Sequence, residues 1–206
     1  IAIVDLTQGE LGTRGSGALR MEECKAASQI LGLVDRVNLG MADGFFEENE
    51  DHLHQIIREI RHFRPKLIFA NSIRDRHPDH GRAAALVARA AFLSGLPKIK
   101  TERNGISQEA YRSPMLLHYI QDMYIEPDVV LDVSAYAEEK IKLVQCFSSQ
   151  FFDPNSTEPE TPISNAHFFE FMKGRMLQFG RPIGAKYAEG FTVNRTLGVS
   201  DLFHLI

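Results

Sequence analysis

The chain has 206 residues, of which 44% are apolar, and its formal net charge is −4. This length and apolar content suit a single domain with a sizeable core, so we expect residues 1–206 to fold as one domain. The acidic balance excludes the broad basic surface of proteins that bind nucleic acid or an anionic membrane, and it favours a small-molecule partner.

Strand and helix patterns alternate along the chain. The expected strands cover residues 1–6, 34–39, 67–70, 115–120 and 129–133. The expected helices cover residues 19–31, 48–63, 81–93, 135–147 and 166–179. Such alternation favours an α/β fold with a Rossmann-like, mostly parallel sheet and helices on both faces. The Pro-rich stretch 153–162 is expected to be a loop, which could be a lid, an oligomer contact or an ordinary surface excursion.

The sequence begins in a strand-like pattern. Its first residue is Ile1, and the run IAIV has no polar lead-in or capping residue before it. The first residues of a domain are usually polar and frayed, whereas this run resembles the middle of a sheet. We therefore expect that a segment precedes it.

Cysteine use and hydropathy indicate the compartment. Cys24 and Cys146 are far apart and lie in helical patterns, which argues for a reducing environment and against a disulfide framework. No apolar run approaches the roughly 20 residues that span a bilayer, and no signal peptide is visible. These features predict a cytoplasmic protein that does not enter membranes.

Four glycines between residues 9 and 17 follow the first expected strand. Their spacing matches neither a Walker loop nor a Rossmann fingerprint, which disfavours nucleotide binding. Arg20 follows at the start of a helix, where its charge opposes the helix dipole. It could grip a carboxylate of a ligand, or it could form a surface pair with Glu22 or Glu23.

The stretch His77, Pro78, Asp79 and His80 follows an apolar strand, at the kind of corner where α/β sheets bind ligands. A catalytic zinc ion takes three protein ligands and leaves a fourth position for water, and His80 could be one such ligand. His77 would point into the same crevice as His80. Asp79 could hold an imidazole in one tautomer. The alternative is an ordinary helix start, with Asp79 at the dipole and both histidines on the surface.

Residues 73–81, with the sequence IRDRHPDHG, closely resemble the second motif of the PIG-L, or LmbE-like, zinc-dependent N-acetylglucosamine deacetylases. Further segments resemble the bacillithiol-pathway branch of that family: VDLTQGELGTRG at 4–15, NLG at 38–40, DGFF at 43–46, SQF at 149–151 and YAEGF at 187–191. The resemblance covers nearly the whole chain. It implies hydrolysis of the N-acetyl group of N-acetylglucosaminyl malate to glucosaminyl malate and acetate, by a homo-oligomer.

The resemblance also implies roles for individual residues. Zn²⁺ would be the cofactor and His80 its third protein ligand. His77 would be the protonated imidazole that stabilises the tetrahedral intermediate, oriented by Asp79. Arg20 matches a substrate-binding arginine of the family, and Arg76 is a second candidate for holding the malate carboxylates.

One family feature is absent from residues 1–206. The first motif, AHPDD, supplies a His and an Asp to zinc and a second Asp as general base. We expect this motif in a preceding strand and helix of roughly 25 to 30 residues, so that the first βα unit is missing here. Two alternatives stay open: a metal-free α/β binding protein that has lost this motif, and a related zinc amidase that acts on sugar-thiol conjugates.

Overall fold

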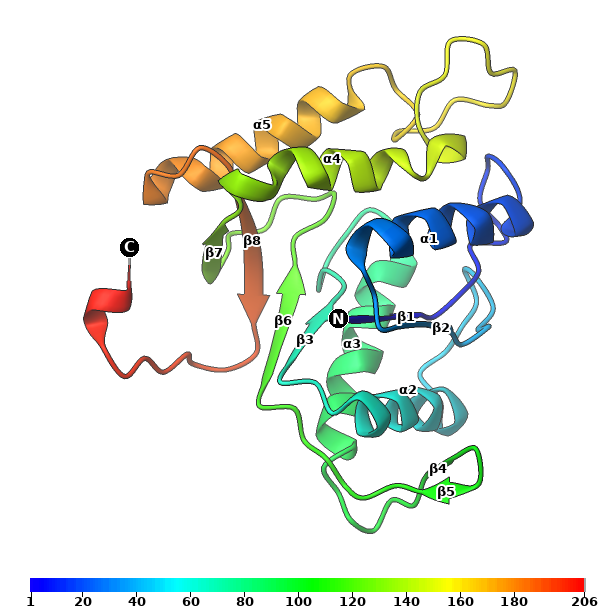
Figure 1. Ribbon diagram of the computed structural model, residues 1–206, viewed down its shortest axis with the longest axis vertical. Coiled ribbons are helices and arrows are strands. Elements are labelled where there is room, and N and C mark those ends of the chain that lie inside the picture. Colours follow the sequence, from blue (N-terminus) through cyan, green and yellow to red (C-terminus); the bar gives the residue numbers. More distant parts are fainter. Residues whose placement is uncertain (206) are drawn as a thin grey trace.

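The computed structural model describes residues 1–205 (Figure 1). The strands are β1 (Ala2–Asp5), β2 (Asp35–Asn38), β3 (Leu67–Ala70), β4 (Glu102–Arg103), β5 (Ile106–Ser107), β6 (Met115–Tyr119), β7 (Val129–Asp132) and β8 (Ala188–Val193). The α-helices are α1 (Gly17–Leu31), α2 (Glu50–Phe63), α3 (Pro78–Leu93), α4 (Ala137–Gln145) and α5 (Phe168–Gly180). Short 3₁₀ helices are η1 (Ser134–Tyr136), η2 (Ser148–Gln150), η3 (Arg181–Ile183) and η4 (Leu202–His204).

The strands form two main groups. β1 pairs in parallel with β2, and a four-stranded sheet has the order β3-β6-β8-β7. β3 and β6 are parallel, whereas β8 runs antiparallel to both of its neighbours. The α/β class and the parallel pairs agree with the sequence prediction. β8 was not predicted as a strand, and because it fills the position between β6 and β7 it makes the sheet mixed.

Local capping sets where the helices begin. Ser16 accepts a hydrogen bond from the Leu19 amide at 3.2 Å at the start of α1, which ends at Gly32 in the left-handed conformation, with φ of 58°. Asn49 caps α2 in the same way, through the His52 amide at 2.9 Å. α3 begins at Pro78, three residues before the predicted start, because His77 is its N-cap and Pro78 suits the first turn.

The main core lies between α2 and α3. Ile57 and Leu86 are fully buried there, and Leu6, Leu39 and Ile68 pack against the same cluster from the ends of β1 and β2 and from β3. Burying such aliphatic side chains contributes about 1.5–3 kcal/mol each. The two parallel groups of strands therefore share one apolar core, and their carboxyl ends lead into neighbouring loops.

A buried arginine anchors the segment that follows α3. Arg61 of α2 is 4% exposed. Its guanidinium donates to the carbonyls of Ser94, Leu96 and Ile99 and to the hydroxyl of Thr101, at 2.8–3.0 Å. Burial lowers the pKa of Arg61, with partial compensation from the Glu109 carboxylate. These contacts fix the segment that leads into the β4–β5 hairpin.

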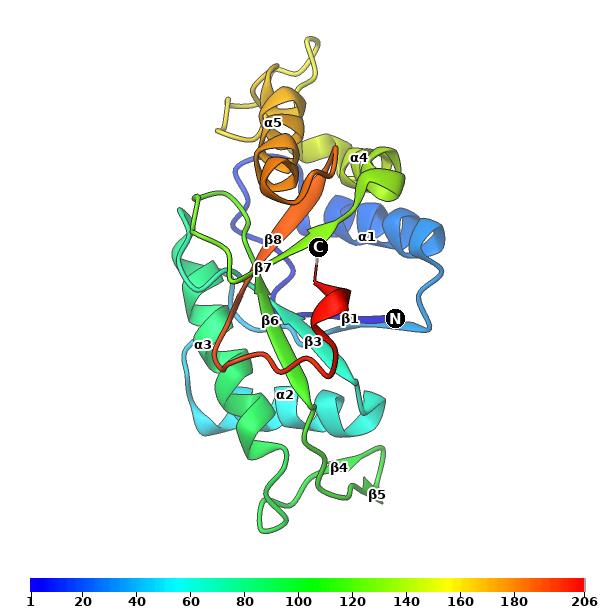
Figure 2. The ribbon, with the colours of Figure 1, turned by 90° about the vertical axis from the view of Figure 1, so that its left-hand side faces the viewer.

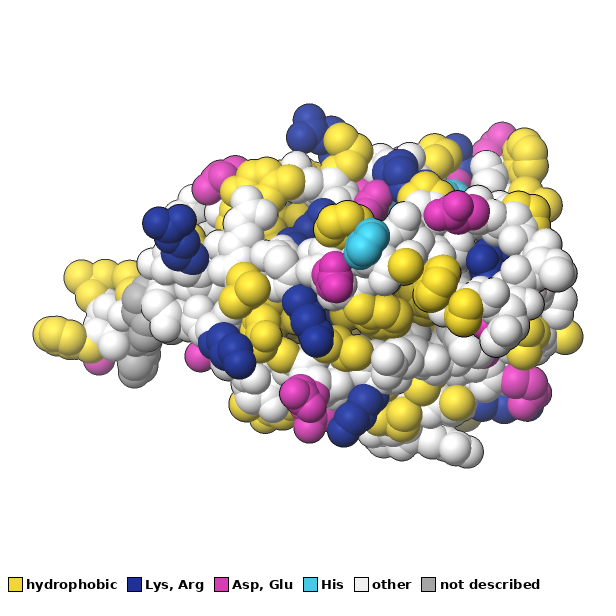
Figure 3. Space-filling view, turned by 90° about the horizontal axis from the view of Figure 1, so that it is seen from above, with side chains coloured by type: hydrophobic (Ala, Val, Ile, Leu, Met, Phe, Trp, Pro, Cys, Tyr) yellow, Lys and Arg dark blue, Asp and Glu magenta, His cyan; other side chains and the backbone are white. Residues whose placement is uncertain are grey.

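The helices divide between the two ends of the molecule. Figures 1 and 2 show α1, α4 and α5 gathered at one end and the β4–β5 hairpin at the other. On the face formed by the α4–α5 end, acidic and basic side chains are interspersed with apolar ones, and no broad basic field is visible (Figure 3).

Both cysteines are free, as predicted, and Cys24 is buried. Within residues 1–205, no helix combines the length and the apolar character that crossing a membrane requires.

Candidate functional site

The start of α3 brings together most of the residues that the sequence singled out. His77, Asp79 and His80 occupy its N-cap and first turn, directly after the loop that leaves β3. The rings of His77 and His80 lie side by side, with centroids 5.2 Å apart. His77 is exposed and His80 is half-buried. Two imidazoles therefore lie next to each other at the carboxyl end of a parallel strand.

Asp75 determines how the His80 ring is held, and the sequence analysis missed it. Its side chain is fully buried, and its Oδ2 lies 2.6 Å from His80 Nδ1. Its Oδ1 accepts hydrogen bonds from three backbone N–H groups: those of Arg76, Met123 and Asp122, at 2.9, 2.8 and 3.2 Å. The carboxylate is thus fixed by the backbone on one side and contacts His80 on the other.

The environment of Asp75 favours its ionised form. Burial raises the pKa of this carboxyl, but the hydrogen bonds from the Met123 amide, the His80 ring and the Arg76 amide outweigh it and leave the pKa below its ordinary value. An ionised carboxylate can only accept hydrogen bonds. His80 Nδ1 is therefore the donor of the 2.6 Å contact, and the lone pair of a neutral His80 lies on Nε2.

The contacts of His77 and Asp79 differ from the expected ones. The ring of His77 accepts at Nδ1 from the backbone N–H of Asp79, at 3.3 Å. The Asp79 carboxylate instead accepts from the Gly44 amide and from Arg82 Nη1, both at 2.8 Å. The orienting role expected for the Asp79 side chain therefore stays a prediction. The Asp79 backbone rather than its side chain contacts His77, because the carboxylate faces the loop after β2.

Three loops meet at this edge of the strands. The loop after β2 contacts Asp79 through Gly44, and it contacts the glycine-rich loop after β1 through Asp43. Asp43 accepts from the Leu11 amide at 3.0 Å, and the Asp43 amide donates to Glu10 at 2.8 Å. The glycine-rich loop is therefore connected to the start of α3 through the loop after β2.

Arg20 of α1 lies against the glycine-rich loop. A Cβ built on Gly9 would come within 3.2 Å of Arg20 Nη1, so the absence of a side chain there makes room for the guanidinium. Arg20 Nε is 3.7 Å from Glu23 and has no hydrogen-bond partner. Glu23 is itself held by the backbone and side chain of Ser149, at 2.7 and 2.9 Å. Both sequence interpretations of Arg20 are thus compatible with these contacts: it lies near a carboxylate but retains free donors.

Arg76 is more exposed and is engaged elsewhere. Its Nε donates to Asp122 Oδ2 at 2.9 Å, and both side chains are nearly half exposed.

The Pro-rich loop at residues 153–162 contacts the glycine-rich loop. Glu158 accepts from the Gly15 amide at 2.8 Å and lies 3.8 Å from Arg14, which is buried.

Two further titratable groups lie next to each other on β6. His118 of β6 is fully buried, with Nδ1 2.8 Å from the Asn71 carbonyl and Nε2 3.2 Å from Asn194. Burial lowers the pKa of His118 despite the opposing contact with Asn71, so this ring is a neutral core residue. The next residue, Tyr119, has its pKa raised to about 12 by burial and by the charges of Asp75 and Asp5.

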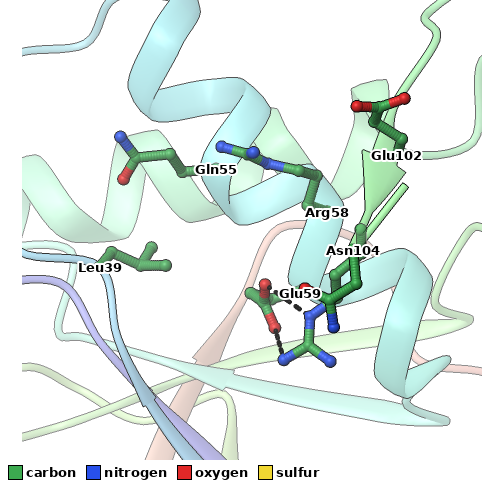
Figure 4. Close-up of a pocket in the computed structure, with 7 residues that line it drawn as sticks. Leu39, Gln55, Arg58, Glu59, Glu102 and Asn104 are labelled. Carbon is green, nitrogen blue, oxygen red and sulfur yellow. Dashed lines mark hydrogen bonds and ion pairs between the residues drawn. The ribbon is translucent and has the colours of Figure 1, made fainter. Parts of the chain in front are cut away.

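A separate pocket lies between α2 and the β4–β5 hairpin (Figure 4). Gln55, Arg58 and Glu59 line one side of it, and Glu59 pairs with Arg103 of the hairpin at 3.2 Å. Its lining contains none of the catalytic, metal-binding or substrate-binding residues predicted from the sequence. We therefore place the candidate site at the start of α3.

His80 fits one position of a zinc site, since an imidazole whose Nδ1–H is held by a carboxylate presents Nε2 to a metal. The described residues do not supply a complete ligand set. Within residues 1–205 no group of three or more His, Cys, Asp or Glu side chains is arranged to hold a metal ion. The carboxylates of Asp75 and Asp79, the two acids next to His77 and His80 in the sequence, already have the contacts given above.

Comparison with known proteins gives consistent matches. Residues 1–92 match the family model described as PIG-L: GlcNAc-PI de-N-acetylase. A diacetylchitobiose deacetylase of Thermococcus kodakarensis is 26% identical over 207 residues, which cover 97% of this chain and 72% of that protein.

Two solved structures extend the match across the fold. A conserved protein of Thermus thermophilus is 30% identical, with a TM-score of 0.81 over 97% of this chain and 84% of that one. The N,N'-diacetylchitobiose deacetylase of Pyrococcus horikoshii, at 22% identity, has a TM-score of 0.75 over 100% of this chain and 77% of that one. At that identity it supports the fold alone. Together with the site described above, these matches identify the chain as a member of the PIG-L family.

Proposed function

We propose that this protein removes the acetyl group from an N-acetylglucosamine unit by metal-dependent hydrolysis. The observation that carries the proposal is the pair of imidazoles at the start of α3, with His80 held by Asp75 and His77 capping the helix. The family membership and the deacetylase activity named for the Thermococcus kodakarensis relative support the same reaction.

His80 is the metal ligand in this proposal, through Nε2. A bound zinc ion would supply Lewis-acid polarisation and a water molecule with a pKa near 7. His77 acts beside it. Because its Nδ1 accepts the Asp79 backbone N–H, a neutral His77 carries its proton on Nε2. A protonated ring also has an N–H at Nε2, but it gives up the contact with the Asp79 amide because its Nδ1 then carries a proton. The N–H at Nε2 can donate to the oxygen of the tetrahedral intermediate, whose developing charge it stabilises.

The remaining ligands require a further structural element. β1 and β3 each have one hydrogen-bonded neighbour within the described residues, and both run parallel to that neighbour. Leu67 and Phe69 of β3 are 36% and 51% exposed, although apolar strands in parallel sheets are normally buried. We propose that a strand outside residues 1–206 lies between β1 and β3. Its carboxyl end would then lie near the His80 ring.

For the substrate, we propose the malate conjugate of N-acetylglucosamine. Arg20 supports this choice because its guanidinium retains free donors beside the glycine-rich loop, and arginine binds carboxylates in a bidentate manner. Arg76 is the weaker candidate because Asp122 already pairs with it. N,N'-diacetylchitobiose is the second candidate, favoured by the 26% identity to the Thermococcus kodakarensis deacetylase.

The test is a parallel assay of the natural polypeptide, loaded with zinc. N-acetylglucosaminyl malate, N,N'-diacetylchitobiose and N-acetylglucosamine are supplied separately, and the free amine and acetate are quantified. We expect the highest kcat/KM with the malate conjugate. A preference for diacetylchitobiose would overturn the substrate assignment alone. Absence of amine from all three substrates, in protein whose zinc content is verified, would refute the deacetylase proposal.

A further inference from the structure

The two carboxylate oxygens of Asp75 have different hydrogen-bond partners. Oδ1 accepts three backbone N–H groups, two of which belong to residues 122 and 123 in the loop after β6. Oδ2 has one side-chain partner, His80 Nδ1 at 2.6 Å. The carboxylate is fully buried, whereas the His80 ring is 26% exposed. The fixed member of the pair is therefore the carboxylate, and the ring takes its orientation from it.

We propose that Asp75 is a positioning residue: it holds His80 in the Nδ1–H tautomer and thereby keeps the lone pair on Nε2, the ring nitrogen that does not contact Asp75. The importance of that lone pair for metal binding rests on the proposed function, but the tautomer itself does not. Carboxylates that hold the second ring nitrogen of a metal-bound histidine commonly raise metal affinity by 10- to 100-fold.

The division of contacts makes Asp75→Asn an informative substitution. Asparagine has nearly the same shape as aspartate, but only one of its two terminal atoms can accept a hydrogen bond. The three backbone N–H groups require an acceptor at the position of Oδ1. The amide NH₂ must then face His80 and donate to its Nδ1. The proton of a neutral ring would move to Nε2, where it would block metal binding.

Other groups around His80 do not provide the same constraint. The Asp79 carboxylate is directed to Gly44 and Arg82, and the neighbouring His77 ring accepts from the Asp79 backbone. Asp122 contributes its amide to Asp75, and its carboxylate pairs with exposed Arg76. Asp122→Asn is therefore a matched control, because it changes an acid to an amide in the loop that contacts Asp75 without altering the contact to His80.

The experiment is ¹H–¹⁵N NMR of the natural polypeptide with ¹⁵N-labelled histidine, first without metal and then with zinc. Spectra are recorded at about pH 9, where an ordinary imidazole is neutral, and His80 is assigned by its loss in His80→Gln. We expect His80 to be protonated at Nδ1 in the wild type and in Asp122→Asn, and at Nε2 in Asp75→Asn. Zinc affinity should fall about 10- to 100-fold in Asp75→Asn alone.

Several outcomes would overturn the proposal. An Nε2–H tautomer of His80 in the wild-type protein would do so without any variant, so the result does not depend on Asp75→Asn folding well. Retention of the Nδ1–H tautomer in folded Asp75→Asn would also refute it, as would an equal loss of zinc affinity in Asp122→Asn. If the tautomers behave as expected but the wild type neither binds zinc nor releases acetate, the proposed function fails while the positioning role of Asp75 stands.

Discussion

The Asp79→Ala substitution removes the side chain that joins the start of α3 to the loop after β2. The carboxylate is 9% exposed and accepts from the Gly44 amide and from Arg82, both at 2.8 Å. A hydrogen bond to a charged group contributes about 1.5–3 kcal/mol. A negative charge in the first turn of a helix adds about 0.3–1 kcal/mol. The partly exposed Arg82 contributes at most about 0.5 kcal/mol.

We therefore expect Asp79→Ala to lower the free energy of unfolding by about 2–4 kcal/mol. Urea denaturation followed by circular dichroism measures this difference. Asp79→Asn should cost less, since its carbonyl oxygen can still accept from Gly44. Asp51→Ala provides the control for the helix dipole alone, because Asp51 is exposed in the first turn of α2, and it should cost about 0.3–1 kcal/mol.

A loss in Asp79→Ala no greater than that in Asp51→Ala would refute the reasoning, because it would mean that the Gly44 and Arg82 contacts are energetically neutral. The His77 ring provides a second check. Its hydrogen bond comes from the backbone of residue 79, so its tautomer should be the same in the wild type and in folded Asp79→Ala. A changed His77 tautomer would instead favour the role that the sequence suggested for the Asp79 side chain.

Three further predictions concern the site. His80→Ala should sharply lower zinc content, measured by elemental analysis, whereas His77→Ala should keep zinc and lose on the order of 10²- to 10³-fold in kcat; zinc loss in His77→Ala would mean that the two roles are exchanged. Arg20→Met should reduce kcat/KM for N-acetylglucosaminyl malate far more than for N-acetylglucosamine, and Arg76→Met should have the smaller effect; equal losses on both substrates would assign Arg20 to the sugar or the fold. Because the pKa of Asp75 is lowered in the folded state, its stabilising contribution is present above its unfolded pKa of about 3.9 and is lost as pH falls through the folded value. The thermal midpoint of Asp75→Asn should therefore depend less on pH below about pH 4 than that of the wild type. Plots of thermal midpoint against pH that run parallel for the two proteins would contradict this.

Periodicity and capping signals in the sequence predict most of the helices and the parallel strands. α2 and β3 occur almost where expected because apolar spacing and the following Pro65 define their limits. β8 escaped prediction because Gly190 interrupts a short run that reads as a motif rather than as a strand. Its place between β6 and β7 depends on pairing with strands distant in the sequence.

The candidate site was likewise predictable from the sequence only in part. The cluster of His77, Asp79 and His80 was visible because its members are adjacent in the sequence. The role of Asp75 was not, because two of the backbone groups that fix it lie 47 and 48 residues away. The contact between Asp79 and Gly44 likewise spans 35 residues. Local patterns give the identity of such side chains, but their hydrogen-bond partners follow only from the tertiary fold.

The buried Arg61 has a consequence for local opening motions. Its guanidinium binds carbonyls of the segment after α3, so that segment cannot separate from α2 without leaving a charged group and its acceptors unpaired. Surface loops usually exchange their amide hydrogens through small local fluctuations. The Tyr111 amide, which donates to the Ser94 carbonyl, should instead exchange as slowly as the amides of α2, as part of one cooperative opening unit with α2 and α3.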